Sequence, residues 1–154
     1  MQSTKQAIFM LGEEEYSFDI MDVNIIEKYI PIEPVANLTK NLKGIIRLRG
    51  DIIPVYSLRR KFGWNDIDAN EDTRFIITTS KGQQIAYEVD KMKEIQQFEE
   101  DQLYAVPPVV RSKETSYMKS ISNVQGNLVI NLDHDGIVTE EEDKLIKDVL
   151  KKVS

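Results

Sequence analysis

The chain has 154 residues, of which 41% are hydrophobic and 30% charged, with a net charge of −6 at neutral pH and no cysteine. This length and composition are typical of one globular domain. The acidic balance argues against nucleic-acid binding, which relies on clustered lysine and arginine. The lack of cysteine excludes disulfides, thiolate nucleophiles and zinc–thiolate sites.

No apolar run reaches the 18 or more residues of a membrane-spanning helix, and residues 1–6 lack the apolar region of a signal peptide. We therefore expect a cytoplasmic protein with no anchor of its own. Any association with a membrane would be indirect, through a partner.

The first half of the chain alternates short apolar segments with Gly, Pro and Asn, a pattern typical of small β-barrels or sandwiches. Residues 7–11 and 16–20 predict a hairpin around an acidic turn. Residues 22–29 predict a short helix, capped by Asp19 or Asp22, because Val23 and Ile26 then share a face.

Residues 44–63 are the most informative segment. They predict two short strands folded about Arg49-Gly50-Asp51, because glycine supplies the backbone freedom that a tight turn needs. Arg47 and Arg49 alternate with apolar residues, so we expect them on an exposed strand face, where arginine is enriched in interfaces. For Arg59, Arg60 and Lys61 we favour a solvated basic turn.

The second half predicts a polar loop over 65–72 and strands over 74–79, 84–90 and 128–132, with a rigid loop at Pro107-Pro108. Residues 139–152 predict a C-terminal helix. Thr139 and Glu142 have the spacing of a capping box. Leu145, Ile146, Val149 and Leu150 form one apolar stripe. No internal sequence repeat is visible.

Catalysis has little support in these residues, so we expect a protein that is not an enzyme. The single histidine, His134, lies in a polar turn and is interpreted as a solvated loop residue. There is no Gly-rich phosphate-binding loop. Acidic clusters such as 13–15 and 99–101 fit a solvated surface better than acid–base chemistry.

One local motif suggests an alternative. Residues 131–142 match the spacing of an EF-hand calcium loop, with Asn131, Asp133 and Asp135 as the first oxygen ligands, Gly136 sixth and Glu142 twelfth. However, a strand precedes the loop where an EF-hand has a helix. Glu142 cannot easily cap the C-terminal helix and bind calcium together. A calcium-modulated binding module is therefore the second hypothesis, and no metal or cofactor is expected in the first.

The stretch Gly44 to Gly63 resembles the signature of the CheW family of bacterial chemotaxis coupling proteins, roughly Gly-apolar-apolar-Asn-Leu-Arg-Gly followed by Pro-apolar-apolar-Asp-Leu-Arg. Weaker matches follow in the family's order. They are residues 9–20, 23–26, 82–92, 107–108, 117–121 and 128–133. The resemblance therefore covers the chain from about Ile8 to Ile137.

This resemblance implies a mainly β fold of two packed, SH3-like, five-stranded barrels. We place the lobes at roughly 17–82 and at 7–16 plus 83–137, with a short helix in the N-terminal half and the helix at 139–152. It also implies an adaptor that couples the tips of methyl-accepting chemotaxis receptors to the regulatory domain of the histidine kinase CheA. The chain length leaves no room for a kinase core or a receiver domain, so we expect a free-standing coupling protein.

The resemblance also selects candidate residues for receptor or kinase contact. Arg49 and Val23 match family positions implicated in such contacts, Gly44 matches the glycine that opens the signature, and Asp90 lies in the family's Val-Asp-x-Val pattern. Two positions that depart from the family pattern are further candidates. Ile25 replaces the usual Glu and Arg47 the usual Asn, and both substitutions suggest a retuned interface.

Overall fold

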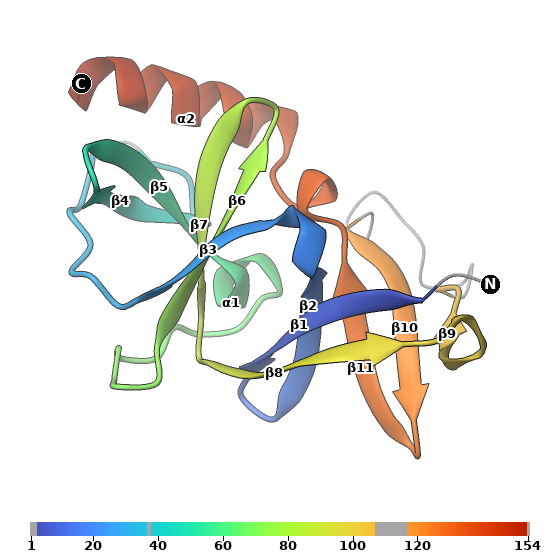
Figure 1. The fold of residues 1–154 in the computed structure, drawn as a ribbon. Coiled ribbons are helices and arrows are strands. Elements are labelled where there is room, and N and C mark those ends of the chain that lie inside the picture. Colours follow the sequence, from blue (N-terminus) through green and yellow to red (C-terminus); the bar gives the residue numbers. More distant parts are fainter. Residues whose placement is uncertain (1–2, 37, 107–116, 154) are drawn as a thin grey trace.

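The computed structural model describes residues 3–36, 38–106 and 117–153, which form two β-sheets packed side by side (Figure 1). One sheet has the strand order β3-β6-β7-β5-β4 and the other β8-β1-β2-β11-β10-β9. We call them the five-stranded lobe and the six-stranded lobe. The two sheets agree with the mainly β fold predicted from the sequence. In the described residues, neither sheet is closed by pairing between its two edge strands.

The five-stranded lobe is continuous in sequence. Its strands are β3 (Val23–Lys28), β4 (Leu42–Leu48), β5 (Asp51–Ser57), β6 (Arg74–Ser80) and β7 (Gln83–Val89). The short helix α1 (Leu58–Lys61) follows β5. Pro54 has no N–H to donate, and it lies in β5 just before the pairing of β5 with β7 begins at Val55.

The six-stranded lobe combines the two ends of the chain. Its strands are β1 (Thr4–Leu11), β2 (Glu14–Asp19), β8 (Lys91–Phe98), β9 (Leu103–Tyr104), β10 (Met118–Val124) and β11 (Asn127–Leu132). Short 3-10 turns lie at η1 (Ile20–Asp22), η2 (Glu100–Gln102) and η5 (His134–Gly136). The expected loop at Pro107-Pro108 lies outside the described residues.

The helix expected over residues 22–29 is wrong. Asp19 does cap a turn, since its side chain accepts a hydrogen bond from the Met21 N–H, but this turn ends at Asp22. Val23–Lys28 continues as strand β3, paired with β6. A six-residue segment with three β-branched residues has two compatible periodicities, and pairing with a neighbouring strand decides between them.

The lobe boundaries also differ from those expected. β2 pairs with β1 in the six-stranded lobe, and β7 pairs with β6 in the five-stranded lobe. The expected divisions at residues 16/17 and 82/83 would split both hairpins. The chain instead passes between the lobes at η1 and at Asp90, which follows β7.

The main hydrophobic core lies between the two lobes. Ring contacts run from Phe9 and Phe18 in one lobe to Tyr87 and Tyr56 in the other, with centroid separations of 5.5, 5.3 and 5.7 Å between successive rings. All four side chains are buried. Because both sheets contribute to one core, neither sheet can turn away without exposing large aromatic surfaces.

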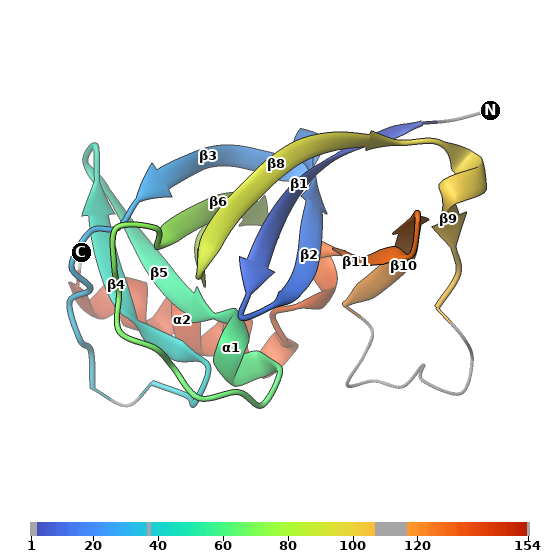
Figure 2. The same ribbon diagram turned by 90° about the horizontal axis from the view of Figure 1, so that it is seen from below.

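Helix α2 (Glu140–Val153) is bound to the five-stranded lobe, where Figure 2 shows it on the far side of β4 and β5. The predicted capping box is present. The Thr139 N–H donates to Glu142 Oε1 at 3.0 Å, and the Glu142 N–H donates to Thr139 Oγ1 at 3.1 Å. The same carboxylate accepts hydrogen bonds from the Tyr56 hydroxyl at 2.8 Å and from Asn41 Nδ2 at 3.0 Å. Glu142 therefore begins the helix and fixes it to the sheet.

We expect Gly44→Ala to destabilise the fold. Gly44 has φ +150°, and a Cβ atom there would lie 2.2 Å from the Glu33 carbonyl oxygen. Strain and displacement of the 30–34 segment should lower the free energy of unfolding by about 2–4 kcal/mol, measured by urea denaturation.

Gly126→Ala is the matched control for this prediction. Gly126 also has positive φ, at +83°, but no atom lies within 4 Å of the added Cβ position. The Gly126→Ala substitution should lower the free energy of unfolding by only about 1 kcal/mol. Equal losses for the two variants would show that the close approach to Glu33 is unimportant.

Candidate functional site

Five of the six candidate residues lie in the five-stranded lobe. Val23 and Ile25 lie on β3, Gly44 and Arg47 on β4, and Arg49 in the β4–β5 turn. β3 and β4 are the two edge strands of the sheet, but the sheet curls and brings the β4–β5 turn close to β3. The ion pair between Arg49 in this turn and Glu27 on β3 joins the two edges.

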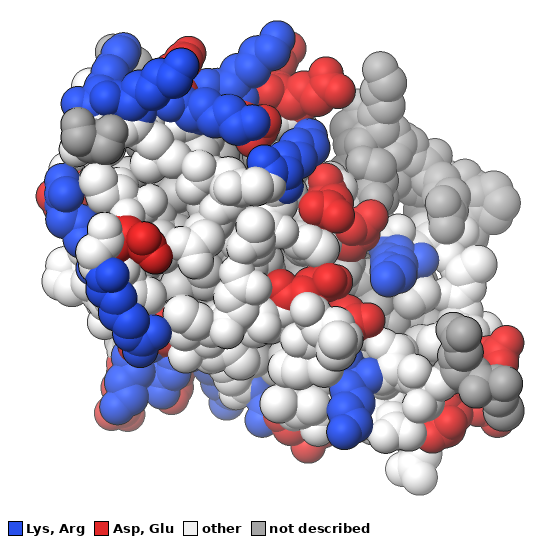
Figure 3. Space-filling model, turned by 45° about the horizontal axis from the view of Figure 1, so that its top comes forward, with Lys and Arg blue, Asp and Glu red and all other residues white. Residues whose placement is uncertain are grey.

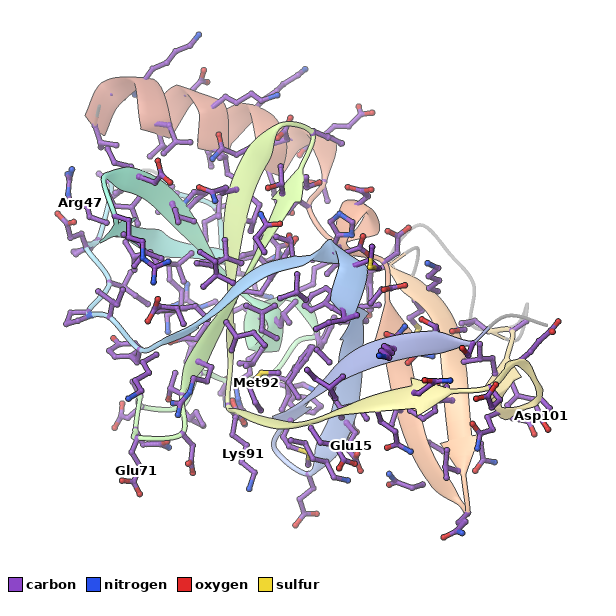
Figure 4. All side chains as sticks on the ribbon, in the orientation of Figure 1. Glu15, Arg47, Glu71, Lys91, Met92 and Asp101 are labelled. Carbon is purple, nitrogen blue, oxygen red and sulfur yellow. The ribbon has the colours of Figure 1, made fainter. Side chains whose placement is uncertain are left out.

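The two arginines are exposed, as predicted. Arg47 projects from the outer edge of β4 (Figure 4), and its Nε lies 2.8 Å from Glu33 Oε2. Arg49 lies in the turn with φ +50°, and its Nη2 is 3.7 Å from Glu27 Oε2 on β3. Its side chain remains 67% exposed. Arg49 therefore belongs to a turn and not to the strand face that we expected it to share with Arg47.

Gly44 allows a close backbone approach. The Glu33 N–H donates to the Ile45 carbonyl at 2.8 Å, and the Ile45 N–H donates to the Glu33 carbonyl at 2.9 Å. This bridge holds the segment before β4 against the strand, and only glycine fits beside it. The structure therefore gives Gly44 a role in the fold.

Val23 and Ile25 are only partly exposed, because both pack against core residues. Their neighbour Ile26 is 38% exposed, and Met21 just before β3 is 86% exposed. Ile25 was a candidate because it replaces the family's usual Glu, whereas the more exposed Ile26 was not a candidate, since the predicted helix gave no reason to place it on the surface. The strand periodicity of Val23–Lys28 was the available signal.

Asp90 forms a polar bridge between the lobes. Its carboxylate receives Arg59 Nε at 2.8 Å and Arg59 Nη2 at 2.5 Å, together with the Gly12 N–H at 2.7 Å. Partial burial acts to raise the pKa of Asp90, but the hydrogen bonds from Arg59 and Gly12 outweigh it and lower the pKa below the usual range. Only 16% of the Asp90 side chain is exposed, because its carboxylate faces Arg59 and the Gly12 N–H and not the solvent.

The expected solvated turn at 59–61 is wrong for Arg59, which is 16% exposed and paired with Asp90. Arg60 pairs with Asp66 at 2.7 Å. Lys61 Nζ lies 5.9 Å from the ring centroid of Tyr117. These cations therefore hold α1 against neighbouring segments.

The calcium ligand set expected at residues 131–142 is not assembled. The Asn131 side chain is buried within the sheet, where its Nδ2 donates to Ser120 and Ser122 hydroxyls, each at 2.8 Å. Glu142 is engaged by Tyr56, Asn41 and the cap of α2. The element entering the loop is strand β11. Asn131 and Glu142, the first and last ligands of the motif, thus form hydrogen bonds within the fold instead.

His134 is also more buried than expected. Its side chain is 13% exposed, with Nδ1 3.3 Å from Asp22 Oδ2 and Nε2 3.3 Å from Asp135 Oδ1. Asp135 Oδ1 in turn accepts a hydrogen bond from the Ser80 hydroxyl at 3.0 Å. His134 therefore lies in a polar junction between the lobes, and the interpretation as a solvated loop residue is wrong.

Among the described residues, no helix is both long and apolar enough to cross a membrane.

We expect Asp90→Asn to lower the free energy of unfolding by about 1–3 kcal/mol at pH 7, because the bond to Arg59 loses its charge. The folded-state pKa of Asp90 lies below its ordinary value of 3.8. The ionised carboxylate therefore stabilises the fold above that value, and this contribution disappears as the pH falls through the lower, folded-state pKa. The difference between wild type and variant should shrink below about pH 4 in urea titrations.

Asp101→Asn, at an exposed carboxylate in η2, is the control and should leave stability unchanged within about 0.5 kcal/mol. A difference between wild type and Asp90→Asn that stays constant from pH 7 to pH 2 would contradict the assignment.

Comparisons with known proteins agree with one another over most of the chain. The family model of the CheW-like domain matches residues 6–142. A chemotaxis protein CheW of Klebsiella aerogenes is 28% identical over 144 residues, covering 94% of this chain and 87% of the relative. The CheW protein of Bacillus subtilis is 23% identical over 89% of this chain and 88% of its own length.

A solved structure is similar in fold. The crystal structure of the scaffolding protein TtCheW from Thermoanaerobacter tengcongensis matches with a TM-score of 0.82 and 29% identity, covering 92% of each chain. Sequence and fold therefore agree over both lobes. The chain belongs to the family of CheW-like domains.

Proposed function

We propose that this chain is a non-catalytic chemotaxis adaptor of the cytoplasm. It couples methyl-accepting chemotaxis receptors to the regulatory domain of the histidine kinase CheA, and it reaches the membrane only through the receptors. The match of the CheW-like family model over residues 6–142, which includes both lobes, is the observation that carries this proposal. The similarity to a protein described as a scaffold supports the same role.

Exposed apolar side chains on the two lobes support a receptor-binding surface. Ile26 lies on β3, the edge strand of the five-stranded lobe, and Ile95 lies on β8, the edge strand of the six-stranded lobe. Ile95 is 58% exposed. Large exposed apolar residues are typical anchors of protein interfaces. We assign the contact with the receptor tip to Ile26, Ile95 and Met21, which precedes β3.

The charge distribution supports a second contact around the β4–β5 turn. Figure 3 shows a broad uncharged surface below a row of basic side chains on the side where α2 lies, with further basic side chains at one side, and the basic residues of α2 itself are all lysines. Arg49 is more exposed than Arg47, and it lies in the β4–β5 turn at the end of the lobe. An exposed guanidinium on a fixed turn suits a charged or polar partner surface. We assign the kinase regulatory domain to Arg49 and Arg47.

The remaining candidates act through the fold in this proposal. Val23 and Ile25 hold β3 so that Ile26 faces outward, Gly44 holds the segment before β4, and Asp90 joins the lobes. A substitution at these positions would weaken binding by displacing the contact residues. Its effect on binding should therefore be accompanied by a loss of stability.

We expect Arg49→Glu to abolish assembly of the complex of adaptor, receptor fragment and kinase while leaving the fold intact. The lost pair with Glu27 is long, at 3.7 Å, and its Arg49 side chain is mostly exposed, so stability should change by less than about 1 kcal/mol. Binding to each partner is measured separately by isothermal titration calorimetry. At least one Kd should rise by about thirtyfold or more, as for an interface hot spot.

Lys5→Glu makes the same charge change at an exposed residue of β1 in the other lobe and is the matched control. It should bind both partners like the wild type. Unchanged affinities in Arg49→Glu would remove Arg49 from the interface. Equal losses in both variants would mean that net charge alone drives binding.

A further inference from the structure

The two lobes repeat one pattern of strand pairing in a permuted order. The orders β3-β6-β7-β5-β4 and β8-β1-β2-β11-β10 correspond strand by strand. Among the described strands of each lobe, the only parallel pair is the third with the fourth, β7 with β5 and β2 with β11. The pairings of β3 with β6 and of β8 with β1 each contain a register shift, as do those of β4 with β5 and of β10 with β11.

This correspondence assigns equivalent residues. The β4–β5 turn has positive φ at Arg49 and Gly50, and the β10–β11 turn has positive φ at Gln125 and Gly126. Counting from these turns, Ile52 corresponds to Leu128. Counting from the β6–β7 and β1–β2 turns, Ile76 corresponds to Ala7. Ile26 is paired with Ile76 and Ile95 is paired with Ala7, so Ile26 corresponds to Ile95.

In the five-stranded lobe, the end of the sheet between the two hairpin turns is partly covered by α2. A hollow of about 600 Å³ lies there. Its walls are residues 50–52 of the β4–β5 turn, residues 82–84 of the β6–β7 turn, and Lys147, Leu150 and Lys151 of α2. The amphipathic helix α2, with lysines beside its apolar stripe, therefore lies at this end of the sheet and forms one wall of the hollow.

The equivalent place in the six-stranded lobe is also hollowed but is not covered by a helix from the described residues. A hollow of about 330 Å³ lies between residues 13–15 of the β1–β2 turn and residues 127–128 of the β10–β11 turn. Ile121 and Ile130 complete its lining. Leu128, at its mouth, is 57% exposed. In Figure 1 the turns of β1–β2 and β10–β11 both lie at the lower side of the molecule, away from α2.

The charge of this hollow differs from that of its counterpart. Glu13, Glu14 and Glu15 stand where the other lobe has Gly82, Gln83 and Gln84, by the pairing of β1 with β2 and of β6 with β7. Glu15 is paired with Lys93 at 2.8 Å. Glu13 and Glu14 remain exposed. An apolar floor with an acidic rim complements a helix that carries lysine or arginine beside its apolar stripe.

We propose that this hollow is a second docking site, which takes a basic amphipathic helix from a partner protein in the position that α2 occupies on the other lobe. The apolar stripe of the helix covers Leu128, Ile121 and Ile130, and its cations face Glu13 and Glu14. The site is separate from Arg49 and Ile26, so the proposal does not depend on the function proposed above.

A helix α2 from a second copy fits this position less well. On its own lobe, α2 is fixed by Glu142, which accepts the Tyr56 hydroxyl. The residue equivalent to Tyr56 is Leu132, because Tyr56 opposes Leu42 and Leu132 opposes Met118 in corresponding strand pairs. Leucine offers no hydrogen bond to a buried carboxylate, so a helix without that acidic residue is favoured.

The test uses a fluorescent peptide of leucine and lysine, 14 residues long like α2, with its leucines on one helical face. A peptide of the same composition in scrambled order controls for charge alone. Binding is followed by fluorescence anisotropy at low ionic strength. Because the chain has no cysteine, Asn127→Cys carries a single label that reports whether the peptide binds at this hollow.

We expect saturable binding of the amphipathic peptide, at least about tenfold tighter than that of the scrambled one. Leu128→Arg and Glu13→Lys should each weaken it by about tenfold or more. Ile67→Arg, at an exposed apolar residue in a loop of the other lobe, should leave it unchanged. All three sites are at the surface, and urea denaturation checks that the variants fold.

Three results would overturn the proposal. Equal binding of both peptides would show attraction by charge alone, and wild-type affinity in Leu128→Arg would place the peptide elsewhere. Self-association of the wild type that Leu128→Arg abolishes, measured by sedimentation velocity, would make a second copy the occupant.

Discussion

The packing of two sheets on one aromatic core is the constraint on which the rest of the structure depends. Phe9 and Phe18 from one lobe meet Tyr87 and Tyr56 from the other, and these rings are fully buried. The six-stranded lobe needs strands from both ends of the chain, so it is complete only when the whole chain has folded. The two lobes therefore present their outer surfaces in a fixed relation, which is what an adaptor for two partners requires.

Polar contacts at the margins of this core hold the same arrangement. Asp90 joins Arg59 of one lobe to the Gly12 N–H of the other, and Glu142 joins α2 to Tyr56. Burial, and then the carboxylate of Glu142, raise the pKa of Tyr56, so its hydroxyl remains a hydrogen-bond donor. Glu142 also resolves the conflict between helix capping and calcium binding, since its oxygens are used by the cap and by the sheet.

Local signals in the sequence predicted the hairpins, the β4–β5 turn and the C-terminal helix with its cap, because glycine, Thr139 and Glu142 act through neighbouring residues. β3 was mistaken for a helix because its partner, β6, lies nearly fifty residues away. The buried environments of Arg59 and His134 depend on residues distant in sequence, so their polar local sequence placed them at the surface. The equivalence of the lobes escaped detection because the strand order is permuted and the paired residues are mostly unlike.

The exposure of the candidate side chains could likewise be predicted only where it depends on neighbouring residues. Arg47 and Arg49 could be placed on the surface from their local pattern, whereas Ile26 and Ile95 become visible as exposed apolar residues only when the strands are paired. Gly44 came from the signature, and its close approach to Glu33 explains the glycine physically. The sequence therefore selects candidate residues, and the fold identifies which of their side chains face outward.

The central claim is that one rigid two-lobed body binds receptor and kinase at the same time. Sedimentation velocity of the wild-type chain mixed with a receptor cytoplasmic fragment and a CheA kinase tests it most directly. We expect a single faster species that contains all three proteins, with the adaptor's affinity for one partner undiminished by the other. Two separate binary complexes that compete for the adaptor would contradict the claim, because they would place both partners on one surface.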